Sequence, residues 1–208
     1  MPTSSTTTLA YYATNAEAFA ASTLNVDFSA TQERFARLLP QGSRVLDFGC
    51  GSGRDARWFK EHGFVVTATD GSPELAAIAE QVAGIPVRVE LFGDLADVEA
   101  FDGVWACSSI LHLPKQELAD VLRRIERALI PGGILYTSFK HGDFEGMRNG
   151  RHFTNFTEPS FRRFVSDVCE LEVEEFWTSA DVRPDRGDER WLNAILRKKQ
   201  VTAHTKAH

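Results

Sequence analysis

The feature that most constrains the fold is residues 45–53, where the apolar run Val-Leu-Asp-Phe passes directly into three alternate glycines. A helical pattern follows over residues 54–62 and stops at Gly63. Glycine allows a tight turn and the close approach of a ligand, and the start of a helix offers free N–H groups. The pattern predicts a strand, a turn and a helix, with a nucleotide-like ligand over the turn. A structural turn without a ligand is the alternative, because a glycine triplet alone is a weak motif.

The alternation of strand and helix continues along the chain. Apolar periodicity predicts strands at residues 64–69, 87–91, 104–107 and 134–139 and helices at residues 74–82, 118–129 and 158–169. Two late strands, residues 171–177 and 191–197, follow one another without a helix, which predicts an antiparallel pair at a sheet edge. We therefore expect an α/β, Rossmann-like three-layer sandwich whose seven-stranded, mostly parallel sheet ends in an antiparallel C-terminal hairpin.

Length and composition predict a single domain over residues 1–208. Polar residues predict tails at residues 1–8 and 199–208, and two amphipathic segments, residues 15–22 and 28–39, predict helices ahead of the first strand. The polar start does not resemble a secretory signal, and no apolar run approaches the ~20 residues that span a bilayer, so we expect a cytoplasmic protein.

Charge and ligand-residue spacing exclude several classes of partner. The formal net charge of −6 disfavours nucleic acid and anionic membranes, which both require a basic face. Cys50, Cys107 and Cys169 are far apart and form no Cys-x-x-Cys pair, and the six histidines are scattered, so we expect neither disulfides nor a metal site. A monomer or a homodimer fits these properties.

Asp70 adds a second signal to the glycine turn. It stands at the end of the second predicted strand, 21 positions after Gly49. In nucleotide-binding α/β folds a carboxylate at this place accepts hydrogen bonds from ribose hydroxyls. The alternative is a turn aspartate, because Asp-Gly is a common turn pair and Ser72 is suited to cap the helix that begins at Pro73.

With both signals in this order, the chain resembles the class I S-adenosylmethionine-dependent methyltransferases, particularly the small bacterial members, over residues 11–197. The glycines Gly49, Gly51 and Gly53 match that family's Gly-x-Gly-x-Gly motif. The nicotinamide fingerprint instead requires Gly-x-Gly-x-x-Gly, and its third glycine would fall on Arg54. An NAD-dependent oxidoreductase is therefore the less favoured alternative.

The resemblance implies S-adenosylmethionine as the cofactor and residues 9–39 as a helical lid over it. It implies that Asp94 and Leu95 contact the adenine, that the segment from Cys107 lies under the methionine part, and that Tyr12 faces the carboxylate or sulfonium. A packing role is the alternative for Tyr12, and a position on the helix surface is the alternative for Arg54. The cofactor-binding residues implied are Tyr12, Asp47, Gly49, Cys50, Gly51, Gly53, Arg54, Asp70, Gly71, Ser72, Gly93, Asp94, Leu95, Cys107 and Ser108.

The acceptor is less clearly indicated. By location, His112 is the candidate general base, although it could equally be a histidine satisfied by the following helix. Aromatic and basic residues beyond the fifth strand suit a small, partly apolar or anionic acceptor, or are solvated loop charges. The substrate-binding residues expected are Lys140, Arg151, Phe153, Arg183 and Trp191. A non-catalytic S-adenosylmethionine-binding regulator remains an alternative to a methyltransferase acting on a small molecule.

Overall fold

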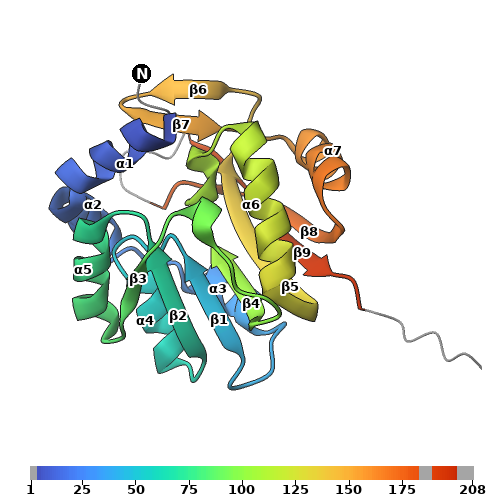
Figure 1. The fold of residues 1–208 in the computed structure, drawn as a ribbon, viewed down its shortest axis with the longest axis horizontal. Helices are drawn as coiled ribbons and strands as arrows, with labels where there is room; N and C mark the ends of the chain where they lie inside the picture. Colours follow the sequence, from blue (N-terminus) through green and yellow to red (C-terminus); the bar gives the residue numbers. More distant parts are fainter. Residues whose placement is uncertain (1–3, 183–188, 201–208) are drawn as a thin grey trace, which may run out of the picture.

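A computed structural model describes residues 4–182 and 189–200 of the chain. Seven strands form one sheet in the order β3-β2-β1-β4-β5-β9-β8, and a separate two-stranded hairpin, β6-β7, stands at its upper edge in Figure 1. The strands of the main sheet are β1 (Arg44–Phe48), β2 (Val65–Asp70), β3 (Val87–Val89), β4 (Phe101–Ala106), β5 (Leu129–Lys140), β8 (Leu171–Ala180) and β9 (Arg190–Lys198). The expected fold class, including the antiparallel C-terminal pair, is confirmed.

The central strands alternate their side chains between two apolar layers. Leu46 and Leu135 belong to the core under α6 (Lys115–Ala128) and α7 (Glu158–Val168). Their neighbours Val45 and Tyr136 belong to the opposite core, which contains side chains of α3 (Ser29–Ala36) and α4 (Arg54–Glu61). Figure 1 shows α6 in front of the sheet and α3 behind it. Burial of both faces explains the near-continuous apolar strands, and it produces three layers.

Three further helices surround one end of the sheet. They are α1 (Ser4–Thr14), α2 (Ala16–Thr23) and α5 (Pro73–Ala83). As predicted, Ser72 caps α5, because its Oγ accepts a hydrogen bond from the N–H of Leu75 (3.3 Å). None of the helices in the described part of the chain has the length and apolar character needed to cross a membrane.

The structure corrects the sequence prediction at two places. Residues 1–8 were expected to be a polar tail, but α1 begins at Ser4, and the hydroxyl of Thr8 is buried where it accepts the N–H of His152 (3.0 Å). No strand was predicted between residues 139 and 158, but this part of the chain contains β6 (Glu145–Arg148) and β7 (Arg151–Thr154), which pair with each other. The start of α1 packs against β7, a contact that local periodicity does not reveal.

Candidate functional site

A cavity of about 420 Å³ opens at the carboxyl ends of β1, β2 and β4. Here β1 lies between β2 and β4. After β1 the chain adds β2 and β3 on one side of β1, and it then crosses over to add β4 and β5 on the other side. Such a switch point is where open α/β sheets bind ligands, because the loops on the two sides diverge. Helices α1 and α2 contribute Tyr12 and Phe19 to the opposite wall. The volume lies within the usual range for small-molecule and cofactor pockets.

The glycine turn between β1 and α4 forms the floor of this cavity. Gly49 and Gly53 have φ values of 81° and 77°, which side chains rarely adopt. A Cβ at Gly49 would lie 2.6 Å from Cβ of Ser109, and one at Gly53 would lie 2.8 Å from Cα of Ala79. These two glycines are therefore required by the fold itself. Gly51 lines the cavity, and a Cβ there would lie 3.1 Å from the ring of Phe19.

Asp70 connects this turn to the next one. Its Oδ2 accepts the N–H of Gly51 (2.9 Å) and its Oδ1 accepts the N–H of Ser72 (2.9 Å). Burial raises the pKa of Asp70, and the two backbone hydrogen bonds oppose that rise. Each carboxylate oxygen has a second lone pair, so the side chain can still accept a ligand hydroxyl while it holds the turns together.

A buried ion pair stands behind the glycine turn. Arg54 donates from Nε and NH2 to the two carboxylate oxygens of Asp55 (2.8 and 2.9 Å). Asp55 also accepts Nε2–H of Gln32 (2.7 Å) and Nε1–H of Trp105 (2.9 Å). Burial acts to raise the pKa of Asp55, but Arg54 and these hydrogen bonds hold it below its ordinary value. Arg54 lines the cavity with its charge already neutralised.

The segment after β4 supplies the next wall. Ser108 has a φ of 52°, unusual for a residue with a side chain. Its backbone N–H donates to Oγ of Ser138 (2.9 Å), and the hydroxyl of Ser109 donates to the carbonyl of Phe48 (2.7 Å). Both bonds hold the segment against the ends of β5 and β1. Burial raises the pKa of Cys107 to about 12, so its thiol stays protonated and is a poor nucleophile.

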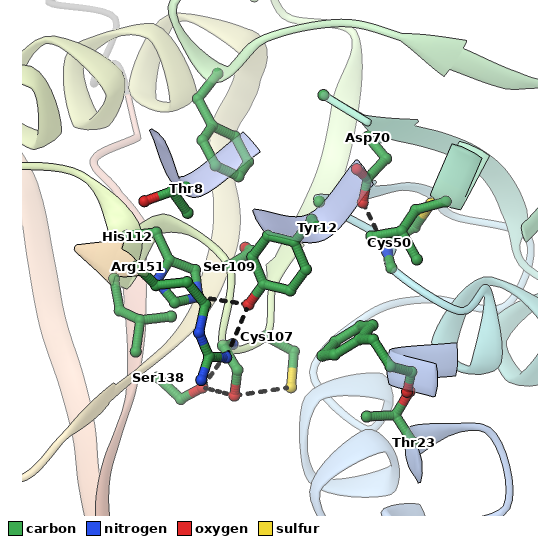
Figure 2. Close-up of a pocket in the computed structure, with 18 of the residues that line it drawn as sticks. Thr8, Tyr12, Thr23, Cys50, Asp70, Cys107, Ser109, His112, Ser138 and Arg151 are labelled. Atoms are coloured by element: carbon green, nitrogen blue, oxygen red, sulfur yellow. Dashed lines mark hydrogen bonds between the residues drawn. The ribbon is translucent and has the colours of Figure 1, made fainter. Parts of the chain in front are cut away.

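A hydrogen-bonded chain crosses the cavity from α1. Nδ1 of His112 lies 2.6 Å from the carbonyl oxygen of His152, and its Nε2 lies 2.7 Å from Oη of Tyr12. A carbonyl can only accept, so Nδ1 carries the proton and Nε2 accepts from the phenol. Burial lowers the pKa of His112 to about 3, which keeps the imidazole neutral. Figure 2 shows Tyr12 between His112 and Arg151 on one side and Asp70 and Cys50 on the other.

Most of the predicted residues meet at this cavity. Its lining includes Tyr12, Gly49, Cys50, Gly51, Arg54, Asp70, Gly71, Gly93, Asp94, Cys107, Ser108, His112, Lys140, Arg151, Phe153 and Trp191. Asp47, Gly53, Ser72 and Leu95 do not line it; Leu95 is wholly buried in the α6 core, and burial raises the pKa of Asp47 well above its ordinary value. Arg183 lies outside the described residues.

Sequence reasoning missed a number of lining residues, among them Thr8, Phe19, Phe92 and Ser138. Phe92 directly precedes the predicted Gly93 turn, and Ser138 is a polar residue near the end of a buried strand, so both carried a usable signal. Thr8 carried none, and Phe19 was indicated only as part of the lid expected at residues 9–39, because the docking of α1 and α2 over the sheet brings both residues to the cavity.

The chain is similar to known methyltransferases. Residues 46–137 match the family described as "Methyltransferase domain". The ubiquinone biosynthesis O-methyltransferase of Xanthomonas axonopodis pv. citri (strain 306) is 37% identical over 110 residues, which are 50% of this chain and 45% of that protein. Methyltransferase GfsG of Streptomyces halstedii is 33% identical over 117 residues, 50% of this chain and 41% of the relative. The aligned part thus spans less than half of these relatives.

Solved structures share the fold over nearly the whole chain. The 1,6-didemethyltoxoflavin-N1-methyltransferase of Burkholderia thailandensis, with bound 1,6-didemethyltoxoflavin and S-adenosylhomocysteine, has a TM-score of 0.76 at 23% identity, over 92% of this chain and 87% of that one. A TehB-like S-adenosylmethionine-dependent methyltransferase of Corynebacterium glutamicum has a TM-score of 0.67 at 24% identity, over 92% and 98%.

Proposed function

We propose that the chain is a class I S-adenosylmethionine-dependent methyltransferase that transfers the methyl group of this cofactor to a small-molecule acceptor, in line with the methyltransferase-domain match over residues 46–137, the methyltransferase relatives and the shared fold. The observation that carries the proposal is the joint position of the glycine turn and Asp70 at the switch point of the sheet, on one wall of a single cavity. A floor that a side chain would obstruct suits a ligand lying directly on the backbone.

We assign the cofactor to the side of the cavity formed by β1, β2 and the turn after β3. In this assignment the carboxylate of Asp70 accepts the ribose hydroxyls, and Phe92, Gly93 and Asp94 border the adenine. Tyr12 and the Cys107–Ser108 segment enclose the methionine part. S-adenosylmethionine brings a methyl group that its sulfonium already activates. The residues therefore act mainly by holding the acceptor in line and by excluding water.

An acceptor that carries a proton on its nucleophile requires a place for that proton. Tyr12 is suited to this task, because its Oη can accept the proton of the acceptor as its own proton passes to Nε2 of His112. The carbonyl of His152 then stabilises the imidazolium through Nδ1–H. Tyr12 and His112 would serve together as the general base, and charge would stay within the enclosed site.

Lys140, Arg151, Phe153 and Trp191 border the remaining part of the cavity, which we assign to the acceptor. A net charge of −6 favours a metabolite over nucleic acid as the acceptor, in keeping with a cytoplasmic location.

Cofactor binding and turnover test the proposal separately. Isothermal titration should give heat with S-adenosylhomocysteine and none with NAD; heat with NAD alone would contradict the assignment. Transfer of a radiolabelled methyl group should then appear with a member of a metabolite panel that includes phenols, amines and carboxylic acids. Tight binding of S-adenosylhomocysteine without transfer to any acceptor would instead indicate a non-catalytic regulator.

A further inference from the structure

Three side chains of lysine or arginine line the cavity among the described residues, and they differ in whether a carboxylate is paired with them. Arg54 is paired with Asp55, and Nζ of Lys140 lies 2.6 Å from Oε2 of Glu189. The third, Arg151 at the start of β7, has no carboxylate of the described residues within 4.0 Å of its guanidinium. The cavity therefore contains one cation whose counter-charge is not supplied by the part of the chain that the structure describes.

The surroundings of Arg151 make this lack of a counter-charge costly. Its guanidinium carbon lies 4.6 Å from the ring centre of Tyr11 and 5.2 Å from that of Phe153. Its Nε is buried without a hydrogen-bond partner, and its NH1 has only a long contact of 3.5 Å to Oη of Tyr12. Arg151 as a whole is half-buried, but its Nε is shielded from water, and aromatic faces stabilise a cation less than an anion does, so a polar partner for this nitrogen is favoured. A bidentate anion is the ligand that a guanidinium fork fits best.

We propose that Arg151 binds a carboxylate of the methyl acceptor, so that the acceptor is a small carboxylic acid with a flat apolar body. The inference rests on the proposed methyltransferase function and narrows its substrate class.

The rest of this wall fits such a body. The ring of Phe153 is shared by both acceptor-side cations, since its centre lies 5.2 Å from Cζ of Arg151 and 5.1 Å from Nζ of Lys140. Trp191 adds a second ring, 5.8 Å from Nζ of Lys140. Flat apolar molecules pack well between such rings.

The reactive atom must lie near the carboxylate. NH1 of Arg151 and Oη of Tyr12 are 3.5 Å apart, and Tyr12 is the residue that we assign to receive the proton of the acceptor. An acceptor whose carboxylate binds Arg151 and whose nucleophilic atom lies at Tyr12 must therefore carry these two groups at neighbouring positions. An ortho-substituted aromatic acid has this arrangement, which determines the choice of probe.

Titration calorimetry on the full chain saturated with S-adenosylhomocysteine tests the proposal. The probes are 2-hydroxybenzoate and its uncharged isostere 2-hydroxybenzamide. We expect the carboxylate to bind at least 10-fold more tightly than the amide. Arg151→Met should weaken the carboxylate by about 10- to 100-fold, the range for a hydrogen-bonded charged group, and leave the amide unchanged. Arg151→Lys, which keeps a point charge, should retain part of the affinity.

Arg148→Met is the matched control, because Arg148 lies on the same hairpin, is exposed, and stacks on Phe144 outside the cavity. It should leave both probe affinities unchanged. Thermal unfolding of each variant confirms that the chain is folded, and Arg151→Lys keeps the test open if the methionine variant does not fold.

Three results would overturn the proposal. Equal affinities for 2-hydroxybenzoate and 2-hydroxybenzamide would show that the cavity does not select a carboxylate. An unchanged affinity for 2-hydroxybenzoate in Arg151→Met would show that Arg151 does not bind it. If Arg151→Met weakens S-adenosylhomocysteine but not 5′-methylthioadenosine, which lacks the amino-acid part, then Arg151 holds the carboxylate of the cofactor. Failure of the wild-type chain to bind S-adenosylhomocysteine would instead refute the proposed function itself, so the two failures are distinguishable.

Discussion

The two sides of the cavity are built in different ways. The cofactor side, formed by the glycine turn, Asp70 and the turn at Gly93, uses backbone and carboxylates at the ends of successive strands. On the acceptor side, Tyr12, which borders both sides, contacts His112 and Arg151, which lie 100 and 139 positions further along the chain. The family match over residues 46–137 contains the first side whole but only His112 of this second group. A binding surface made of local turns is thus visible as a motif, whereas a surface made of distant side chains is not.

The two sides also differ in charge. Asp70 and Asp94 line the cofactor side, whereas the acceptor side contains Arg151, which has no carboxylate partner among the described residues, and Lys140, which is paired with Glu189. Such a separation orients a ligand pair that carries a cation at one end and an anion at the other, since each charge is attracted to one wall. The following predictions test whether the two sides are as independent as this contrast implies.

The largest effect is expected in the glycine turn of the cofactor side, where the turn packs against α5. Gly53→Ala should lower the free energy of unfolding by about 3 kcal/mol, because the new Cβ meets the backbone of Ala79 at a left-handed φ. Urea denaturation measures it. Gly93→Ala is the matched control, since a Cβ there meets nothing within 4 Å, and it should change little. A stable Gly53→Ala protein would show that the turn is less constrained than the structure indicates.

A smaller effect, on rate alone, is expected on the acceptor side. Once an acceptor is known, His112→Ala should lower kcat about 100-fold, equivalent to about 2.7 kcal/mol, because Tyr12 loses the group that takes its proton. The affinity for S-adenosylhomocysteine should stay the same. A parallel loss of cofactor affinity would join the two sides into one functional unit and contradict their separation.

Asp70→Asn should act in the opposite manner. It should weaken S-adenosylhomocysteine by ~1.5–3 kcal/mol, the scale for hydrogen bonds to a charged group, while the folded protein keeps its carboxylate-probe affinity. Calorimetry measures both. Asp120→Asn, at an exposed position on α6, is the control and should change neither affinity. An unchanged affinity in folded Asp70→Asn would exclude the ribose role.

The smallest effect concerns pH. Burial lowers the pKa of His112 to about 3, whereas an unfolded histidine titrates near about 6.5. Between these values the unfolded chain binds more protons, so stability should fall as the pH drops below about 6.5, by about 1 kcal/mol per pH unit. Urea unfolding at several pH values measures the slope, and His112→Gln should flatten it. Equal slopes in both proteins would show that His112 is not buried in its neutral form.

The success of the sequence predictions also depended on whether a feature is built from residues that are close in sequence or distant. The order of strands and helices, the antiparallel edge pair and the cap at Ser72 were predicted because each depends on residues close in sequence. The start of α1 was not predicted, because it packs on β7, which is 144 positions away at the Thr8–His152 hydrogen bond. The β6–β7 hairpin was missed although its Asn149-Gly150 turn is a local signal of a two-residue hairpin loop. Leu95 shows the same limit: it belongs to a motif turn, yet its side chain is directed into the core.

By itself the sequence determined the strand–turn–helix with its glycines, the carboxylate after the second strand and, from their order, the type of cofactor. Only the tertiary structure decided that Tyr12 donates to His112, that Arg54 and Lys140 have carboxylate partners, and that Arg151 lies among aromatic rings without one among the described residues. The physical reason is the distance along the chain between the residues that interact. Turn geometry and helix capping act over a few residues, whereas ion pairing and burial depend on which distant segments the packed sheet brings together.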